Sequence, residues 1–197
     1  MLRVEDTVLV LLAAGRSERF GDVGSKLDEA FLGKPLGLHV AVALQELPFK
    51  DRVVVTGRAA VDYEPCGYRA LPNPDAAAGM ASSVRIGVGH ARAQGAAAVL
   101  IALADMPRVT AAHILRLFDA SGGDDTVVAS SDGREPKPPA VFGAGRFDFL
   151  LALEGDQGAR ELVAGGRHVV TSPAELIDVD TPEQLEALRA LARPERD

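Results

Sequence analysis

Short apolar runs alternate with segments of helical periodicity along this chain, and this alternation constrains the fold more than any other feature. Residues 7–14 (TVLVLLAA) and 97–104 (AAVLIALA) are continuous apolar runs of strand length, rich in Val and Leu. Such runs are typical of strands that are buried on both faces of a sheet. Residues 80–94 and 111–119 have helical spacing, and Thr110 is a candidate cap for the second segment. The pattern predicts an α/β fold with a mainly parallel sheet.

The remaining segments continue the alternation, and neither an internal repeat nor a low-complexity linker divides them. We therefore expect a single domain over residues 1–197, with a frayed tail at 190–197. Pro35 is expected in the first turn of one helix, and Thr181-Pro182 at the start of the last. The further predicted strands are 52–56, 126–131, 139–142, 168–171 and 176–179, and the further predicted helices are 35–47, 144–153, 156–164 and a helix from about 181.

The charge and composition exclude several classes of protein. The formal net charge is −7, which argues against a general affinity for nucleic acid, because such binding needs many Lys and Arg side chains. No apolar run reaches the ~18 residues of a membrane span, and the first residues lack the pattern of a signal peptide. Cys66 is the only cysteine, so no intrachain disulfide can form. We expect no nucleic-acid or membrane partner and a cytoplasmic location.

Positive charge is concentrated in the loop that follows the first apolar run. Gly15 ends that run, and Arg16, Arg19 and Lys26 follow it. A glycine loop beyond the carboxyl end of a strand can turn backbone N–H groups toward an anion, so this loop suits a polyphosphate. The spacing of its glycines matches neither a P-loop, G-x-x-x-x-G-K-(S/T), nor the dinucleotide motif G-x-G-x-x-G. The alternative is a surface loop with solvated charges.

Carboxylates lie at the ends of two later segments. Asp105 directly follows the apolar run 97–104, where a carboxylate can bind a hard cation such as Mg²⁺. The alternative for Asp105 is a helix cap. Asp178 and Asp180 flank Val179, so they share a face if this stretch is extended. Asp180 directly precedes Thr181-Pro182 and could serve the helix start instead.

The sequence resembles the nucleotidyltransferases that handle the molybdenum cofactor. LLAAGRSERFG followed by Lys26 is similar to their L-A-(A/G)-G-x-S-x-R-(F/M)-G…K signature. Five further segments match in the same order, so that the resemblance covers about residues 8–185 and is more specific than the glycine loop alone. The resemblance implies a three-layer α/β/α sandwich of the nucleotide-diphospho-sugar transferase type. The five segments are NPDAAAGMASSVRIGV (73–88), ALADMP (102–107), PPAVF (138–142), GDQGAR (155–160) and DVDTPEQL (178–185).

The resemblance also implies catalytic roles. Lys26 would stabilise charge on the phosphate under attack, and Arg19 would contact the leaving phosphates. Asp105 would hold Mg²⁺, or Mn²⁺ as an alternative, with help from Asp178 or Asp180. We prefer Asp178 slightly, since Asp180 has the competing role at the helix start.

Two binding regions follow from the same resemblance. The nucleotide would contact the glycine loop and the segment before the 80–94 helix, although close packing or helix capping could also explain the small residues and serines there. The acceptor would face residues of the second half of the chain, where Lys137 replaces the small residue of many relatives. The nucleotide-binding residues are Leu12, Ala13, Ala14, Gly15, Arg16, Ser17, Gly79, Ser82 and Ser83, and the acceptor-binding residues are Arg134, Lys137, Asp156 and Arg160.

Together these features predict a Mg²⁺-dependent nucleotidyltransferase that moves a nucleoside monophosphate onto a phosphorylated small-molecule acceptor and releases pyrophosphate. LAAG in such proteins tends to accompany cytidine nucleotides, so CTP is the favoured substrate. The resemblance alone implies molybdopterin as the favoured acceptor. A guanylyltransferase, or an NTP transferase acting on a sugar phosphate or small phospho-acid, is the first alternative. A non-catalytic nucleotide- or cofactor-binding accessory protein is the second. A molybdoenzyme or its chaperone is a candidate transient partner.

Overall fold

The computed structural model describes residues 1–15, 20, 25–155 and 159–192. A single seven-stranded sheet forms the centre of this part of the chain, in the order β5-β4-β1-β6-β8-β7-β9. Within this sheet β8 alone runs antiparallel to its neighbours. The sheet is therefore mainly parallel, as predicted. Its strands are β1 (Thr7–Ala13), β4 (Asp51–Thr56), β5 (Arg69–Pro72), β6 (Ala98–Leu103), β7 (Val127–Ser131), β8 (Pro136–Gly143) and β9 (Arg167–Val170).

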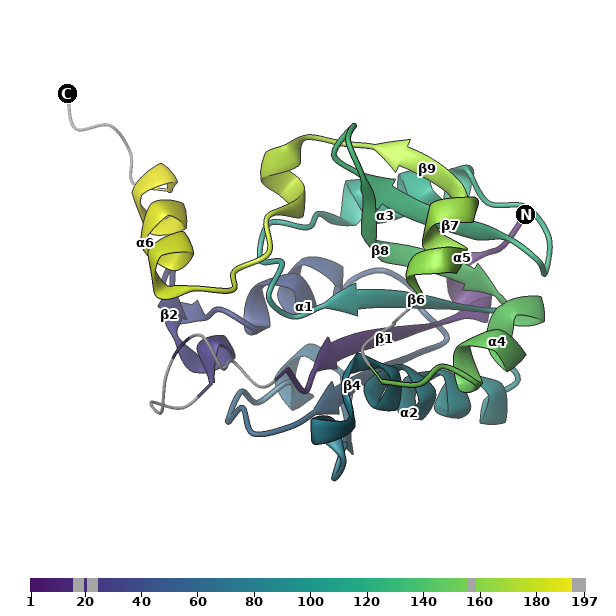
Figure 1. The fold of residues 1–197 in the computed structure, drawn as a ribbon, viewed down its shortest axis with the longest axis horizontal. Coiled ribbons are helices and arrows are strands. Elements are labelled where there is room, and N and C mark those ends of the chain that lie inside the picture. Colours follow the sequence, from purple (N-terminus) through teal and green to yellow (C-terminus); the bar gives the residue numbers. More distant parts are fainter. Residues whose placement is uncertain (16–19, 21–24, 156–158, 193–197) are drawn as a thin grey trace.

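Helices cover both faces of the sheet (Figure 1). On β1, Leu9 and Leu11 belong to one buried cluster, which also contains residues of α1 (Leu38–Leu44) and α3 (Ala111–Asp119). Val8 and Val10 belong to a second cluster with α2 (Met80–Ala93), α4 (Phe147–Leu151) and α5 (Arg160–Gly165). Because alternate residues of a strand point to opposite faces, one apolar run supplies both cores. The architecture is the predicted three-layer α/β/α sandwich.

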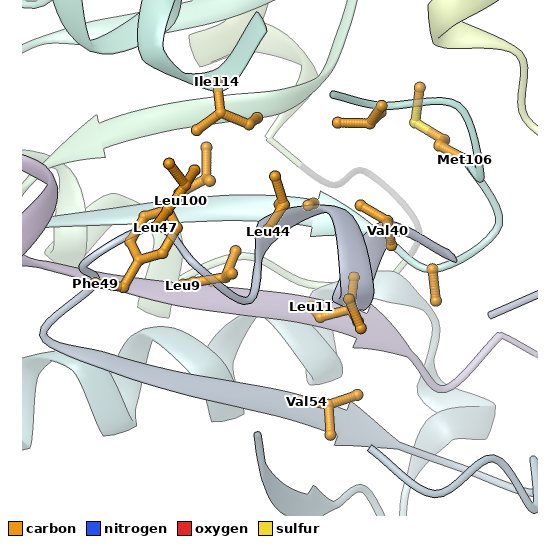
Figure 2. Close-up of a cluster of buried hydrophobic side chains, with 14 of the residues drawn as sticks. Leu9, Leu11, Val40, Leu44, Leu47, Phe49, Val54, Leu100, Met106 and Ile114 are labelled. Carbon is orange, nitrogen blue, oxygen red and sulfur yellow. The ribbon is translucent and has the colours of Figure 1, made fainter. Parts of the chain in front are cut away.

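The first of these cores extends to the edge where the strands end. Figure 2 shows Leu9 and Leu11 of β1 and Val54 of β4 facing Val40 and Leu44 of α1. Met106, which follows β6, is 1% exposed and belongs to the same cluster. The turn directly after β6 is therefore anchored by apolar packing.

A third, smaller core lies beyond the sheet edge. The helix α6 (Pro182–Leu191) packs Leu185 and Leu188 against Phe31 and Leu36, which belong to or adjoin the hairpin of β2 (Ala30–Phe31) and β3 (Lys34–Pro35). In Figure 1 these elements lie together at one end of the molecule. Thr181 caps α6 through a capping box with Gln184, and Pro182 occupies the first turn, as predicted.

Short 3₁₀ helices complete the described chain. They are η1 (Val4–Asp6), η3 (Lys26–Asp28), η4 (Glu64–Cys66), η5 (Ala76–Ala78), η6 (Ala144–Arg146) and η7 (Pro173–Leu176).

Several predicted boundaries are wrong. The predicted strand 176–179 is absent: η7 ends at Leu176, and the Val179 N–H donates to the Asp105 carbonyl oxygen at 3.0 Å, beyond the end of β6. Pro35 lies in β3 rather than in the helix expected over 35–47, and α1 begins at Leu38.

Other elements differ from the prediction in extent or were missed. Residues 144–153 divide into η6 and α4, and β8 is longer than the predicted 139–142. The strand β5 and the β2–β3 hairpin were missed because they are short and contain proline, which weakens a strand pattern. Among the described residues, none of the helices has the length and apolar character needed to cross a membrane.

Two glycines of α2 allow a direct test of the packing. A Cβ on Gly87 would lie 2.3 Å from Cγ1 of Val10, whereas a Cβ on Gly89 would have Leu151 Cδ2 as its nearest neighbour at 4.0 Å. We expect Gly87→Ala to lower the free energy of unfolding by about 1–3 kcal/mol through overpacking. Gly89→Ala, the matched control, is expected to raise it by about 0.5–1 kcal/mol through helix propensity. Urea denaturation measures the free energy of unfolding of both variants. Equal changes in the two variants would contradict the close contact between Gly87 and Val10.

Candidate active site

The ends of several strands bring the predicted site residues to one edge of the sheet. β1, β4 and β6 are parallel and end at Ala13, Thr56 and Leu103. β8 is antiparallel to β6, so its first residues lie at this same edge. The Ala104 N–H donates to the Leu12 carbonyl oxygen at 3.0 Å and extends the β1–β6 pairing to the residue before Asp105. Ligands of open α/β sheets bind at such an edge.

An ion-pair cluster centred on Lys26 occupies this edge. The Lys26 Nζ lies 2.8 Å from Asp105 Oδ2 and 2.7 Å from Asp180 Oδ1. Lys26 is 7% exposed, although it belongs to the short η3 between a loop and a hairpin. The three residues come from the segment after β1, the turn after β6 and the approach to α6. The predicted catalytic residues Lys26 and Asp105 are thus in direct contact.

Local structure holds each of these side chains in place. In η3 the Ser25 hydroxyl accepts from the Leu27 N–H at 3.3 Å, and Leu27 is buried in the core of α1. Asp105 is followed by the buried Met106 and accepts the Val179 N–H on its carbonyl oxygen. The Asp180 N–H donates to Gln184 Oε1 at 2.7 Å. The backbone bond from Val179 to Asp105 thereby joins the two carboxylate-bearing segments.

Burial and charge act in opposite directions on these groups. Burial raises the pKa of the Asp105 carboxyl, Lys26 acts to lower that pKa, and the nearby Asp180 and Asp178 raise it further. Burial acts to lower the pKa of Lys26, but Asp105 and Asp180 outweigh it, so that the net direction is upward. Lys26 is therefore charged at neutral pH, and the buried carboxylate of Asp105 depends on a nearby cation.

The carboxylates have the donor chemistry of a Mg²⁺ or Mn²⁺ site. Asp105 Oδ1 is buried and has no hydrogen-bond partner among the described residues, which leaves an unused oxygen ligand at this point. In the described part of the chain no group of three or more His, Cys, Asp or Glu side chains could hold a metal ion by itself. One or two carboxylates plus substrate phosphates are the usual ligands of Mg²⁺, so the residues present fit a metal that arrives with a nucleotide.

The predicted nucleotide residues of the first strand also lie at this edge. Leu12, Ala13 and Ala14 are nearly buried, while Gly15 is exposed, and a Cβ on Gly15 would meet open space. A Cβ on Gly57, just after β4, would lie 3.0 Å from the Ala14 Cα. The loops after β1 and β4 thus approach closely, and Gly57 permits this.

The serines predicted to face the nucleotide share one buried partner. Asn73 Nδ2 donates to Ser82 Oγ at 2.8 Å and to Ser83 Oγ at 2.9 Å, while Asn73 Oδ1 accepts from the Asp75 N–H at 2.9 Å. Ser82 Oγ donates to backbone carbonyls, the nearest being that of Gly79 at 2.8 Å. The Ser83 hydroxyl proton has no acceptor among the described residues, so Ser83 can donate to a ligand. Gly79 has φ +90°, a conformation that favours glycine.

Among the described residues, no hydrogen bond or ion pair joins the predicted acceptor residues Arg134, Lys137 and Arg160 to one another. Lys137 Nζ lies 3.2 Å from Asp132 Oδ2, within the turn that joins β7 and β8. Asp132 also accepts the backbone N–H groups of Glu135 and Arg134, and these bonds lower its pKa to about 2. The side chain of Lys137 therefore braces this turn. Arg134 is exposed in the same turn, and Arg160 is exposed at the start of α5.

Four predicted site residues lie outside the described residues. They are Arg16, Ser17, Arg19 and Asp156.

Comparison with known proteins identifies the family. Residues 9–172 match the model of the MobA-like NTP transferase domain. This chain belongs to the MobA-like NTP transferase family. It is 33% identical to the purine catabolism protein PucB of Bacillus subtilis (strain 168), over 91% of this chain and 94% of PucB. It is 28% identical to the phosphoenolpyruvate guanylyltransferase of Conexibacter woesei, over 84% of this chain and 78% of that protein.

A solved structure supports the fold. The manganese complex of Rv0371c from Mycobacterium tuberculosis H37Rv superposes with a TM-score of 0.70 at 24% identity, over 93% of this chain and 98% of that one. The predicted nucleotide-diphospho-sugar transferase fold and the predicted resemblance to nucleotidyltransferases are confirmed. The chain is a nucleotidyltransferase of the MobA-like family, which acts on a nucleoside triphosphate and a phosphorylated acceptor.

Three residues of this MobA-like site were missed in the sequence. Asn73 lies in the segment 73–88 that carries the resemblance, but no role was predicted for it. An asparagine before a proline and a predicted helix is a recognisable signal of a polar side chain that binds the helix start. Gln184 was detectable from the capping-box spacing after Thr181. Tyr63 is 3% exposed, its hydroxyl has no hydrogen-bond partner among the described residues, and burial together with Asp28 and Asp105 raises its pKa. Nothing in the sequence around Tyr63 indicates this position.

Tyr63 also lines a cavity. The cavity has a volume of about 510 Å³ and is lined by residues of β4, η4 and β5, including Tyr63 and Tyr68. None of the residues that line it was predicted to belong to the site.

A chain of polar side chains links α3 to the strands β7 and β8. Arg116 Nη2 donates to His113 Nδ1 at 3.2 Å, so His113 Nε2 carries the proton and donates to Ser130 Oγ at 2.7 Å. Ser130 Oγ in turn donates to the Pro139 carbonyl oxygen at 2.7 Å. The chain links α3, β7 and β8 and requires a neutral His113.

The pH dependence of stability tests this chain. Burial lowers the pKa of His113; Glu175 opposes this shift and Arg116 adds to it. Because the unfolded state then binds more protons below about pH 6.5, we expect stability to fall as the pH drops below that value, by at most about 1.4 kcal/mol for each pH unit. His113→Gln, which retains a donor for Ser130, is expected to reduce this slope in urea denaturation at pH 7.5, 6.5 and 5.5.

The variant is expected to keep part of the pH dependence, because burial also lowers the pKa of His39, which both proteins contain. Only the difference between wild type and variant is assigned to His113. Identical slopes in the two proteins would show that His113 is protonated in the native state, contrary to the hydrogen-bond pattern.

Proposed function

We propose that this protein is a metal-dependent cytidylyltransferase that transfers CMP from CTP to the phosphate of a molybdopterin acceptor and releases pyrophosphate. The contact of Lys26 with Asp105 and Asp180 at the strand ends carries the proposal. It places a buried positive charge and two oxygen ligands at the position where open α/β sheets bind nucleotides. Membership of the MobA-like family supplies the reaction class.

In this mechanism the acceptor phosphate oxygen attacks the α-phosphorus of the nucleotide in line, and pyrophosphate leaves. The protein contributes positioning and charge stabilisation and forms no covalent bond to the substrate. Lys26 binds a phosphate oxygen of the transferring group. Arg19 contacts the leaving phosphates. Two polyanions repel each other, so these cations are required for the substrates to approach.

Asp105 and Asp180 would hold Mg²⁺ or Mn²⁺, which when bound neutralises charge on the phosphate oxygens. The buried and unpartnered Asp105 Oδ1 supports this role. The Lys26 contact now favours Asp180 over Asp178, which we preferred on sequence alone. The manganese complex of the Rv0371c neighbour is consistent with a divalent cation in this fold.

The base would lie against Ala13 and Ala14, which are small and nearly buried. Ser83 would donate its hydroxyl proton to an acceptor atom of the base or ribose, since Asn73 already donates to its oxygen. Cytosine as the base rests on the LAAG sequence alone. A molybdoenzyme or its chaperone as the recipient of the product likewise rests on the sequence resemblance.

A guanylyltransferase is the second candidate. Phosphoenolpyruvate guanylyltransferase from Conexibacter woesei aligns over most of both chains, and its name specifies a guanine nucleotide and a small phospho-acid. In this alternative the same lysine and carboxylates would act on GTP.

Pyrophosphate release with each of the four NTPs, Mg²⁺ and a set of acceptors tests the proposal. The set includes isolated molybdopterin, phosphoenolpyruvate and a hexose 1-phosphate. We expect release with CTP and molybdopterin. Release with GTP alone would contradict the interpretation of Ala14. Thermal stabilisation by an NTP without pyrophosphate from any acceptor would indicate a nucleotide-binding accessory protein.

Neutralising Asp105 tests the site itself. We expect Asp105→Asn to reduce turnover about 100- to 1,000-fold, which corresponds to about 3–4 kcal/mol at the transition state, because a preorganised charge is lost. Asp148→Asn is the matched control: the Asp148 side chain is 92% exposed on α4 and pairs with Arg92. Turnover of that control is expected to match the wild type. Unchanged turnover in a folded Asp105→Asn protein would exclude Asp105 from the chemistry.

A further inference from the structure

The Lys26 ammonium lies where a divalent cation would be expected to bind. It contacts one oxygen of Asp105 at 2.8 Å and one of Asp180 at 2.7 Å. These are the carboxylates that the proposed function assigns to the metal. A phosphate-binding lysine would be expected to face the substrate, but in this structure its charge is directed at the carboxylates instead.

Lys26 and a divalent cation cannot both bind Asp105 and Asp180 without electrostatic repulsion. A divalent cation on Asp105 and Asp180 would be close to an ammonium bound to the same two carboxylates, and like charges at such separations repel strongly at a buried site. Lys26 also leaves Asp105 incompletely satisfied, since Asp105 Oδ1 has no hydrogen-bond partner among the described residues. The present arrangement therefore satisfies Lys26 but leaves ligand capacity unused on the carboxylate.

We propose that Lys26 and the divalent cation compete for Asp105 and Asp180, so that Lys26 is the counter-ion of the nucleotide-free site and moves to the triphosphate when metal and nucleotide bind. This inference rests on the proposed function. It assigns Lys26 two successive anionic partners and makes the exchange between them part of substrate binding.

Exchange of this kind couples the two ligands. Metal alone must displace Lys26 without offering it a new partner, so the free protein binds metal weakly. A triphosphate supplies that partner, so metal and nucleotide bind together more tightly than either alone. The coupling is reciprocal: the factor by which the nucleotide raises the affinity for metal equals the factor by which the metal raises the affinity for nucleotide. Asp105 and Asp180 retain a positive neighbour in both states, which avoids an uncompensated buried carboxylate.

Lys26→Met is the decisive variant, since it keeps an unbranched side chain only one atom shorter and removes the charge. We expect it to bind Mn²⁺ without nucleotide at least 10-fold more tightly than the wild type, and to bind Mn²⁺-CTP at least 10-fold more weakly. Electron paramagnetic resonance of free Mn²⁺ measures the first affinity and calorimetry the second. Lys50→Met is the matched control, because Lys50 is exposed and its Nζ donates to the Gly95 carbonyl oxygen at 3.3 Å, and it has no proposed role in the site. Its Mn²⁺ affinity is expected to equal that of the wild type.

An equal or weaker affinity of Lys26→Met for Mn²⁺ would overturn the inference, because it would mean that metal and lysine occupy the site together. Thermal denaturation gives a second test. Without metal, the Tm of Lys26→Met is expected to lie below that of the wild type, and added Mn²⁺ is expected to raise the Tm of the variant more than that of the wild type.

A measurement on the wild type covers the case in which Lys26→Met does not fold. The chain has four lysines, Lys26, Lys34, Lys50 and Lys137, so the ε-methylene signals of ¹³C-lysine protein can be resolved by NMR. Titration with Mg²⁺-CTP is expected to shift the Lys26 signal, with little change in Lys50 and Lys137. Binding of Mg²⁺-CTP by calorimetry with an unmoved Lys26 signal would overturn the inference.

Failure of this inference is distinguishable from failure of the proposed function. If the wild type releases pyrophosphate and Lys26→Met shows no gain in Mn²⁺ affinity, the exchange is contradicted and the proposed enzymatic activity is supported. If Lys26→Met gains Mn²⁺ affinity but the wild type releases no pyrophosphate with any NTP and acceptor, the exchange is supported and the proposed enzymatic activity is contradicted.

Discussion

The fold of this protein around its functional edge depends on the ion pairs of Lys26 with Asp105 and Asp180. A charged amine that is 7% exposed is stable only beside carboxylates, and a buried carboxylate needs a cation in turn. The interaction joins residues 154 positions apart, from the loop after β1 to the approach to α6. It therefore fixes where the third, small core of α6 and the β2–β3 hairpin lies relative to the sheet.

The rest of the architecture serves to make this edge rigid. The two large cores hold β1 and β6 side by side, so that Ala13 ends, and Asp105 follows, strands which cannot shift separately. Hydrogen bonds continue the support past the strand ends, from Ala104 to Leu12 and from Val179 to Asp105. Asn73 does the same for Ser82 and Ser83 at the start of α2. Preorganised groups of this kind favour a reaction in which the protein positions and neutralises charge.

The β7–β8 turn is built differently from the strand ends after β1 and the start of α2. The β7–β8 turn is braced by Asp132, which binds two backbone N–H groups and Lys137, and β7 and β8 are joined beneath it by the chain from His113 through Ser130. Arg134 and Arg160 are exposed there. Ala13, Ala14, Ser82 and Ser83, by contrast, are small and buried. Exposed turns tolerate sequence variation more readily than buried residues do.

The sequence by itself determined the fold class, the strands β1, β4 and β6, and the helices α2 and α3 to within about one residue, because continuous apolar runs and cap residues are local signals. Its motifs also named Lys26, Asp105 and Asp180. Only the tertiary structure decided that Lys26 touches both carboxylates and that Asp180 rather than Asp178 pairs with it. It also decided that residues 177–180 lie outside the sheet, where the Val179 N–H bonds to the Asp105 carbonyl oxygen. Ion pairs between distant segments depend on the packing of the whole chain, for which no local pattern exists.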